Sequence, residues 1–207
     1  MNMFQLAFCI LRRPHDTFRI LQKERESFSF VPVILLCALL VCVRIAFIYS
    51  VHYPLQDIRP RQANLIVEAA FLVLPLLMWA VANFAVTSIM DGETMMRESL
   101  TASLYCMVPY MVLMLPLALF SHALSNSGEG LYSLLQYAIY GWCGILFVMS
   151  IKVMNNYTAL KTIGVIIINI LVVALMLAIA LLTIALVNQL WMFIEGLVRE
   201  FSYTFRR

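Results

Sequence analysis

Residues 86–100, VTSIMDGETMMRESL, place a short charged segment between two long apolar runs. No Asp, Glu, Lys or Arg occurs between Glu68 and Asp91, and the run from Ser99 to Gly128 is equally free of charge. A helix needs about 20 mainly apolar residues to cross a bilayer, so each run is long enough to span one. The charged segment is therefore predicted to be a tight turn that joins two membrane-spanning helices.

The composition of the whole chain agrees with a membrane protein. Of its 207 residues, 63% are hydrophobic and only 12% are charged, and the mean hydropathy is +0.92. Soluble domains carry roughly 25% charged residues, so this much apolar surface does not fit inside one water-soluble core. The net charge of +3 comes without a clustered basic face, which excludes nucleic acid as a partner.

Five segments are long and apolar enough to span the membrane. They cover residues 30–50, 65–90, 100–124, 131–151 and 163–188. Lipid offers no hydrogen-bond partners to free backbone groups, and continuous apolar runs do not fit the alternating pattern of barrel strands, so each segment is predicted to be a helix. Pro75, Pro109 and Pro116 lie inside the second and third segments, where each is expected to kink the helix. The predicted fold is all-α, with five transmembrane helices in one membrane domain over residues 30–190.

The two ends of the chain are predicted to be interfacial amphipathic helices. In residues 1–29, Phe4, Phe8 and Leu11 recur at helical spacing ahead of a basic segment. This pattern favours a helix at the membrane surface, and the alternative is a flexible tail. In residues 191–207, aromatic and apolar residues recur every three or four positions and arginines follow. That pattern favours a second surface helix, and the alternative is a continuous extension of the fifth span.

The positions of lysine and arginine predict the orientation in the membrane. One side holds the N-terminal segment and the turns after the second and fourth spans, and it carries eight Lys and Arg residues. The other side carries five. We therefore predict a multi-pass protein of the cell membrane with a cytoplasmic N-terminus and an external C-terminus.

The sequence offers no catalytic, cofactor-binding or metal-binding motif. The five cysteines form no Cys-x-x-Cys pair and the three histidines are scattered, so neither a zinc site nor a disulfide framework is predicted. A serine nucleophile in a glycine-rich turn and paired aspartates in facing spans are also missing from the sequence. We predict that the protein is no enzyme and needs no cofactor.

Arg44 is the one charged residue deep in a predicted span. Such residues are costly in lipid and are candidates for a function. Three interpretations are open. Arg44 pairs with Glu68 near the start of the second span, or its long side chain reaches the membrane surface about 9 Å away, or it contacts a substrate.

The charged turn has a predicted structural role of its own. Gly92 is expected to take the left-handed conformation that ends the second span, and Thr94 is expected to cap the next helix through its hydroxyl. The acidic residues Asp91, Glu93 and Glu98 leave three interpretations open. They lie in water, or they face basic residues on the same side of the membrane, or they bind a partner.

Several motifs follow one another around this turn. Asn83 and Thr87 precede the Asp-Gly-Glu turn, and Tyr105, Pro109 and Tyr110 form a Tyr-x-x-x-Pro-Tyr motif after it. Near the start of the chain, RRPHDTFRIL at residues 12–21 contains Arg-Pro-x-x-x-Phe. In their order and spacing, over nearly the whole chain, these motifs resemble the Yip-domain family of membrane proteins, and its short bacterial members in particular.

The resemblance implies five spans, a cytosolic N-terminus and no catalytic activity. It also implies that the partners are membrane lipids and other integral membrane proteins, because bacterial relatives are often encoded beside ABC transporters. We therefore predict a non-catalytic accessory subunit that stabilises or regulates a transporter such as an ABC importer through its permease subunits. Two alternatives are a small-solute transporter or channel that acts alone, and a scaffold for membrane traffic or membrane organisation.

Overall fold

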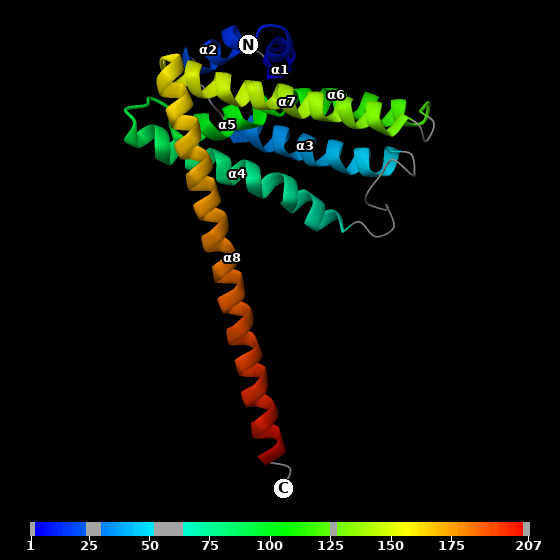
Figure 1. Ribbon diagram of the computed structural model, residues 1–207, viewed down its shortest axis with the longest axis vertical. Coiled ribbons are helices and arrows are strands. Elements are labelled where there is room, and N and C mark those ends of the chain that lie inside the picture. Colours follow the sequence, from blue (N-terminus) through cyan, green and yellow to red (C-terminus); the bar gives the residue numbers. More distant parts are fainter. Residues whose placement is uncertain (1–2, 24–29, 52–63, 125–127, 205–207) are drawn as a thin grey trace. The chain divides into compact units, whose positions relative to one another are not determined.

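The computed structural model describes residues 3–23, 30–51, 64–124 and 128–204 (Figure 1). Within these ranges, the regular structure is entirely helical. The helices are α1 (Met3–Arg12), α2 (Pro14–Lys23), α3 (Phe30–Ser50), α4 (Leu65–Ile89), α5 (Met96–Cys106), α6 (Val108–Ser121), α7 (Glu129–Met154) and α8 (Ala159–Thr204).

Among the described residues, five helical stretches are long and apolar enough to cross a membrane, which confirms the predicted five-span, all-α fold. α3 has the bounds that the sequence predicted, and α4 ends one residue before the predicted end of its span. α7 and α8 are longer than their predicted spans. The third span consists of two helices, α5 and α6.

The break in the third span lies at Met107. Pro109 has no N–H to donate to Tyr105 O, and in a continuous helix its ring would clash with that carbonyl, so the helix is interrupted here. A tight turn closes the break, in which Met107 N donates to Leu104 O at 3.1 Å. Pro75 and Pro116, by contrast, lie inside helices that continue past them.

α5 lies at the centre of the bundle, in contact with α3, α4 and α7. All of its residues from Glu98 onward except Leu100 are buried, although the helix is rich in hydroxyl groups. Ser99 shows how these groups are accommodated. Its hydroxyl donates to Ala80 O at 2.8 Å and accepts from Asn83 Nδ2 at 3.1 Å. Hydrogen bonds across the α4–α5 contact thus replace the water that these polar groups would otherwise need.

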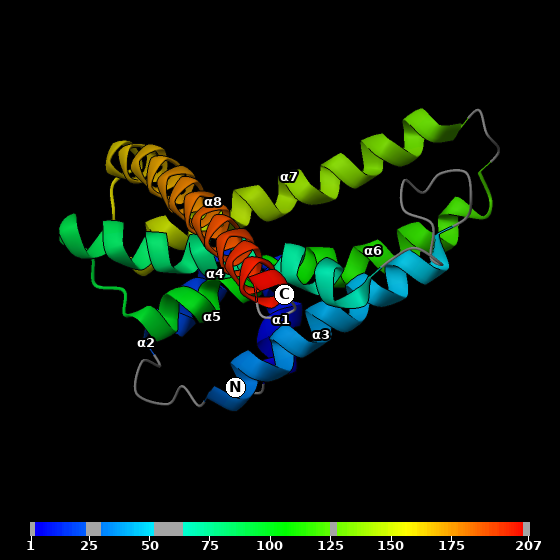
Figure 2. The same cartoon turned by 90° about the horizontal axis from the view of Figure 1, so that it is seen from below.

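α6 continues from α5 and packs between α3 and α7 (Figure 2). The core at these contacts is apolar: Tyr105 is 2% exposed, Met114 is fully buried and Leu146 is 1% exposed. At the end of the bundle where α6 finishes, the His122 ring nitrogen Nε2 lies 2.8 Å from Ser50 O. This contact joins the end of α6 to the end of α3.

The N-terminal segment forms α1 and α2, so the flexible-tail alternative is wrong for residues 3–23. Leu6 and Ile10 of α1 are buried in the core, whereas Phe8, on the predicted membrane face, is 71% exposed. α1 is therefore apolar on two sides, of which one packs against the protein. Contact of the Phe8 side with lipid stays a prediction.

α2 docks on the end of α7, where three of its residues, Thr17, Phe18 and Leu21, are buried. Gln22 Nε2 donates to Met154 O at 3.3 Å. The basic residues of α2 are thus held by the protein at the end of the bundle where the charged turns lie. Contact with the membrane is not the only interaction that holds them.

α8 runs without a break from Ala159 to Thr204, over 46 residues. The alternative of a continuous extension therefore describes the backbone of residues 191–204. The chain packs as two units, residues 1–169 and 170–207, and the second unit consists of the rest of α8 and the C-terminal residues. The predicted domain boundaries after residues 29 and 190 stay predictions.

The topology can be tested at the two ends of α7. Gly130 has open space around the position of a Cβ, and Lys152 is exposed, so cysteine fits at either site. We expect a membrane-impermeant thiol reagent to label Gly130→Cys from outside the cell, and Lys152→Cys only after the membrane is opened. The unmodified chain, with its five cysteines, is the control. Labelling of both positions from the same side would contradict a membrane-spanning α7.

Candidate functional site

The ion pair predicted as one of three alternatives for Arg44 is present. Arg44 Nη2 of α3 lies 2.8 Å from Glu68 Oε2 of α4, and Arg44 Nε lies 3.3 Å from the same oxygen. The two side chains are 21% and 12% exposed, so both charges are largely removed from solvent. A pair of this kind avoids leaving a lone charge at partial depth in the membrane.

The start of α4 positions Glu68 for this pairing. Asn64 precedes the helix and its Oδ1 accepts from Ile66 N at 3.1 Å, which fixes the first turn. Glu68 lies in that first turn, where the partial positive charge of the helix N-terminus favours a carboxylate. The helix start and the arginine of α3 therefore act on the same side chain.

The ion pair lines one end of a cavity of about 380 Å³. Ten residues surround the cavity, and they belong to α3, α4, α6, α7 and the junction at Met107. They are Arg44, Glu68, Phe71, Leu72, Met107, Tyr110, Tyr140, Cys143, Gly144 and Phe147. The rings of Tyr110 and Tyr140 are stacked, with centroids 6.1 Å apart and planes at 19°. Tyr132, two turns before Tyr140 on the same helix, is 4% exposed.

Tyr110 is the most unusual polar group of this cavity. It is 2% exposed and faces Arg44, yet its hydroxyl makes no hydrogen bond of acceptable geometry within the described residues. A buried hydroxyl without a partner costs on the order of 1–3 kcal/mol. The cavity therefore combines a charge pair with an unused hydroxyl.

Sequence reasoning singled out Tyr110 only as part of a motif, and it missed Tyr132 and Tyr140. A signal for these residues exists in the sequence. Tyr132, Gln136 and Tyr140 recur at intervals of four, which places them along one side of α7. Gln136 Nε2 donates to Tyr140 Oη at 3.2 Å. The other two residues of the motif have structural positions, because Tyr105 is buried in the core and Pro109 follows the break at Met107.

The predicted conformation of the charged turn is wrong at Gly92. Asp91 takes the left-handed conformation, with φ of 53°, and no described glycine has a positive φ. Asp is one of the few residues that tolerate this region, so the chain can reverse without glycine there. Gly92 N donates to Thr87 O at 2.7 Å and closes the end of α4.

Gly92 is instead required by the close approach of the turn between α7 and α8. A Cβ at Gly92 would lie 2.5 Å from Tyr157 Oη and 2.6 Å from Asn155 Oδ1. Tyr157 Oη donates to Met90 O at 3.0 Å, which holds the two turns together. Burial, followed by the nearby Asp91 carboxylate, raises the pKa of Tyr157, so the phenol stays protonated and remains a donor.

Thr94 does not cap α5 as predicted. Its hydroxyl donates to Asn155 Oδ1 at 2.6 Å, and its backbone N–H donates to the same oxygen at 3.2 Å. The N-cap of α5 is Met95, whose backbone N–H donates to Glu98 Oε2 at 3.1 Å. The long-range bond to Asn155 thus takes the hydroxyl away from the local cap.

The three acids of the turn have different environments. Asp91 and Glu93 are exposed, whereas Glu98 is 3% exposed and holds the start of α5. The interpretation that all three acids lie in water is therefore wrong for Glu98. Lys161, one of the basic residues proposed to face them, lies over the Tyr157 ring at 4.6 Å. Binding of a partner by Asp91 and Glu93 stays a prediction.

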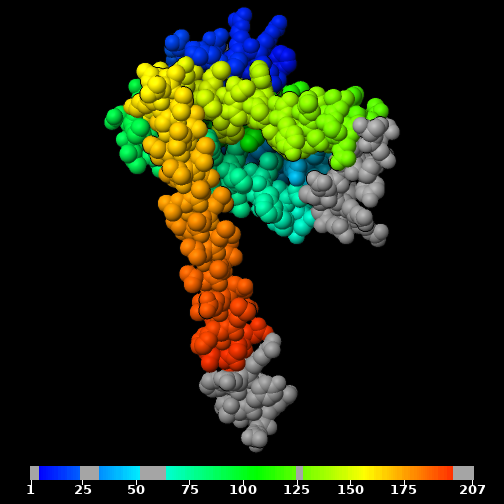
Figure 3. Space-filling view, in the orientation of Figure 1, coloured from blue at the N-terminus to red at the C-terminus, as the bar shows by residue number. Residues whose placement is uncertain are grey.

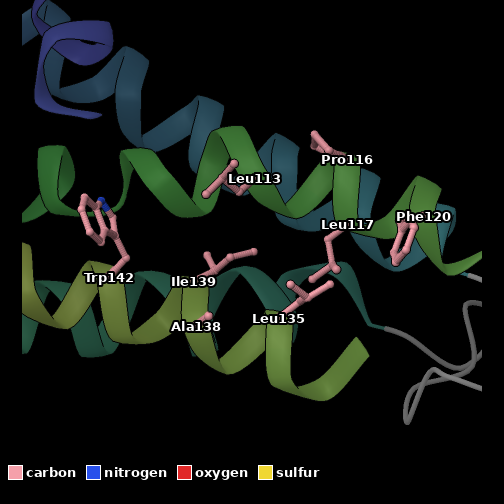
Figure 4. Close-up of a pocket in the computed structure, with 8 residues that line it drawn as sticks. All are labelled: Leu113, Pro116, Leu117, Phe120, Leu135, Ala138, Ile139 and Trp142. Atoms are coloured by element: carbon pink, nitrogen blue, oxygen red, sulfur yellow. The ribbon is translucent and has the colours of Figure 1, made fainter. Parts of the chain in front are cut away.

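A second groove, of about 610 Å³, lies between α6 and α7 (Figure 4). Side chains of both helices point toward one another across it, among them Leu113, Leu117 and Ile139. All of its lining residues are apolar apart from the ring nitrogen of Trp142. It therefore lacks the polar groups that would orient a ligand. Elsewhere in the described ranges, no three His, Cys, Asp or Glu residues lie together as a metal site would require.

The ion pair can be tested with a double-mutant cycle. We expect Arg44→Leu and Glu68→Leu each to lower the free energy of unfolding by about 2 kcal/mol, because each leaves an uncompensated charge. The double variant should recover most of this loss, since it leaves no charge behind. Thermal unfolding in mild detergent measures all four proteins. Strictly additive losses would show that the two side chains do not interact.

The turn can be tested by exchanging the roles of its two central residues. We expect Gly92→Ala to destabilise the protein by about 1–3 kcal/mol, because the added methyl group meets Tyr157 and Asn155. Asp91→Gly should be neutral or slightly stabilising, since glycine adopts the left-handed region without steric cost. The folded yield and the unfolding temperature measure both variants. The opposite ranking would restore the sequence-based assignment of the left-handed conformation to Gly92.

The family model of the Yip1 domain matches residues 8–187. No curated protein and no solved structure matches the chain. The matched region contains the charged turn, the ion pair and all the residues that line the cavity. It covers most of the sequence, and the chain therefore belongs to the Yip1 domain family of membrane proteins.

Proposed function

We propose that this protein is a non-catalytic binding subunit that packs through α8 against another integral membrane protein. The observation that carries this proposal is the length and surface of the second unit, residues 170–204 of α8. A continuous helix of this length extends over about 50 Å, whereas the hydrocarbon core of a bilayer is about 30 Å thick. Part of this helix therefore lies outside the hydrocarbon.

The surface of this unit is mostly apolar over residues 170–197, where Thr183, Asn188, Gln189 and Glu195 are the exposed polar residues. Trp191, Phe193 and Ile194 are 68%, 64% and 46% exposed, although they follow the polar pair Asn188 and Gln189. Large exposed apolar side chains beyond the hydrocarbon need cover, because a contiguous patch in water is costly. A protein partner supplies that cover along a helix that does not break.

Small residues support a helical partner within the membrane. Ala174, Ala178 and Ala185 are exposed and lie within about 40° of one another around the helix axis, by their spacing. Association of helices in lipid depends on close packing, and small residues allow two backbones to approach. The resemblance to bacterial Yip-domain proteins suggests that the partner is a transporter permease, such as the membrane subunits of an ABC importer.

A transporter or channel that acts alone is the second candidate function. It is favoured by the cavity between α4 and α7, which holds a charge pair inside a membrane domain. The two functions make opposite statements about the isolated chain: the first needs a second protein, and the second does not.

We expect the chain, purified through a tag in mild detergent, to bring down permease and ATPase subunits in fixed ratio. Ala178→Leu should lower their recovery by about tenfold, which corresponds to about 1.4 kcal/mol of binding free energy. Ala180→Leu is the matched control, since Ala180 is an exposed alanine of the same helix on another side. Mass spectrometry identifies the subunits, and the unfolding temperature shows that both variants are folded.

Two results would contradict the proposal. The first is a clean homo-oligomer that moves solute across liposomes, which would favour the second candidate function. The other is an equal loss of partner in both alanine variants, which would show that no particular side of α8 is recognised.

A further inference from the structure

The cavity beside the ion pair continues into a second cavity of about 480 Å³. Five residues line both: Phe71, Leu72, Met107, Gly144 and Phe147. The two cavities therefore form one groove between α4 and α7, and a hollow is visible between these helices in Figure 3. We call it the α4–α7 groove.

The two ends of the α4–α7 groove differ in chemistry. Arg44, Glu68, Tyr110 and Tyr140 bring charged and hydroxyl groups to the first cavity. The second is lined only by apolar and aromatic residues, which include Pro75, Leu76, Trp79, Val148 and Ile166. From Glu68 to Trp79, the groove follows α4 for about 16 Å. A ligand that fills it must have a polar head and a long apolar chain.

The polar end has unused hydrogen-bonding capacity. Arginine has five N–H donors, and the ion pair uses those on Nε and Nη2. Both bonds end on Glu68 Oε2, so Oε1 accepts no hydrogen bond from the described residues. The Tyr110 hydroxyl, on a side chain that is 2% exposed, lies beside the Arg44 guanidinium but makes no hydrogen bond of acceptable geometry with it or with another described residue. These groups offer donors to an anion and an acceptor to a cation within one site.

The charges of the site limit which lipid head groups can bind there. The Arg44–Glu68 pair is neutral as a whole, so a ligand with a net charge would leave one member of the pair overcompensated in a low-dielectric site. A zwitterion keeps the balance, since its phosphate meets the guanidinium and its ammonium meets the carboxylate. Guanidinium groups bind phosphate oxygens with charge-assisted hydrogen bonds, which a phenol hydroxyl supplements.

The rim of the groove is open at the side of the bundle. Phe71 and Tyr140, which lie on two spanning helices, are 74% and 42% exposed. In a membrane, the surface of spanning helices meets lipid, so a lipid molecule reaches the groove without crossing water. Gly144 contributes no side chain to the floor, and nothing lies within 4 Å of the position of its Cβ.

We infer that the α4–α7 groove binds one phospholipid with a primary amine in its head group, of the phosphatidylethanolamine class. Its phosphate lies at Arg44 and Tyr110, and its ammonium group lies at Glu68. One acyl chain follows α4 toward Trp79, where the edge-to-face contact of Trp79 with Phe147, with centroids 5.3 Å apart, lines the apolar part of the groove.

The first experiment fills the groove. Native mass spectrometry of the whole chain, purified in mild detergent containing phosphatidylethanolamine, should show one retained lipid per chain. Gly144→Leu should lower this occupancy by about tenfold, because the new side chain takes the place of the acyl chain. Gly141→Leu is the matched control, since Gly141 has the same open space on the same helix but lines none of these cavities. Equal occupancy in the two variants would overturn the inference.

The second experiment tests the head group. Detergent micelles that contain equal amounts of phosphatidylethanolamine, phosphatidylcholine and phosphatidylglycerol should yield mainly the first lipid, by about fivefold or more. The methylated amine of phosphatidylcholine has no N–H for Glu68, and phosphatidylglycerol has no cation. Retention of all three in equal amounts would mean ordinary boundary lipid, and preference for phosphatidylglycerol would mean an anion site. Either result would overturn the inference.

The third experiment separates a lipid site from a solute site. Soluble glycerophosphoethanolamine carries the same two charges without the acyl chains, and we expect it not to displace the lipid at millimolar concentration. Tyr110→Phe removes one hydroxyl and no volume of the ring, so the protein should fold normally and retain the lipid several-fold less. Displacement by glycerophosphoethanolamine, or unchanged retention in Tyr110→Phe, would contradict the assigned contacts.

Discussion

The structure depends on one constraint: in lipid, every polar group must find its partner within the protein or at a membrane surface. The backbone meets this constraint by forming helices, and many hydroxyl groups meet it by bonding to their own helix. Thr87 Oγ1 donates to Asn83 O at 2.7 Å, and Ser103 Oγ donates to Ser99 O at 2.7 Å. The ion pair between α3 and α4 meets the same constraint for two full charges. Each of these solutions fixes a particular pair of elements, so the requirement to satisfy polar groups also selects the arrangement of helices.

The same constraint explains why the least apolar part of the third span lies at the centre. α5 carries serine, threonine and glutamate, and it is in contact with five other helices, α2, α3, α4, α6 and α7. At its contact with α4, Ser99 bonds to both Asn83 and Ala80. The more apolar α6 follows after the break at Met107. At the end of the bundle, polar side chains hold the two turns together. Asn155 accepts both hydrogen bonds of Thr94, and Tyr157 donates to Met90. These contacts connect α4, α5, α7 and the start of α8 at one place.

The spans could be predicted from the sequence because they depend on local composition alone, and α3 was predicted with the observed bounds. The conformation of the charged turn could not be predicted from the sequence, because it depends on residues more than sixty positions away. Nothing near Gly92 in the sequence reveals that Tyr157 and Asn155 approach it, and glycine was therefore assigned the left-handed conformation that Asp91 takes. Thr94 was misassigned for the same reason. The Arg44–Glu68 pair was among the predicted alternatives because both charges were visible against an apolar background. The tyrosines of α7 were not identified, since tyrosine is common in membrane helices and only the fold brings Tyr140 to Tyr110.

The exceptions to the constraint are informative because they are few within the described residues. Buried side-chain atoms without a hydrogen bond include Asn83 Oδ1, Tyr110 Oη and both polar atoms of the Asn169 amide. Asn83 keeps a bond to Ser99 through its amide nitrogen, so only its oxygen is left over. Asn169 is the last residue of the first unit, at the point where α8 passes into the second. Tyr110 differs from both, because it lines a cavity that also contains a charge pair. An unsatisfied group in a closed core only lowers stability, whereas one that faces an accessible cavity can be satisfied by a ligand. The ion pair keeps Arg44 in place when that cavity is empty, and it still leaves donors for a second anion. The groove beside α4 is therefore a position at which a molecule taken from the membrane can satisfy a polar group that the fold itself leaves unsatisfied.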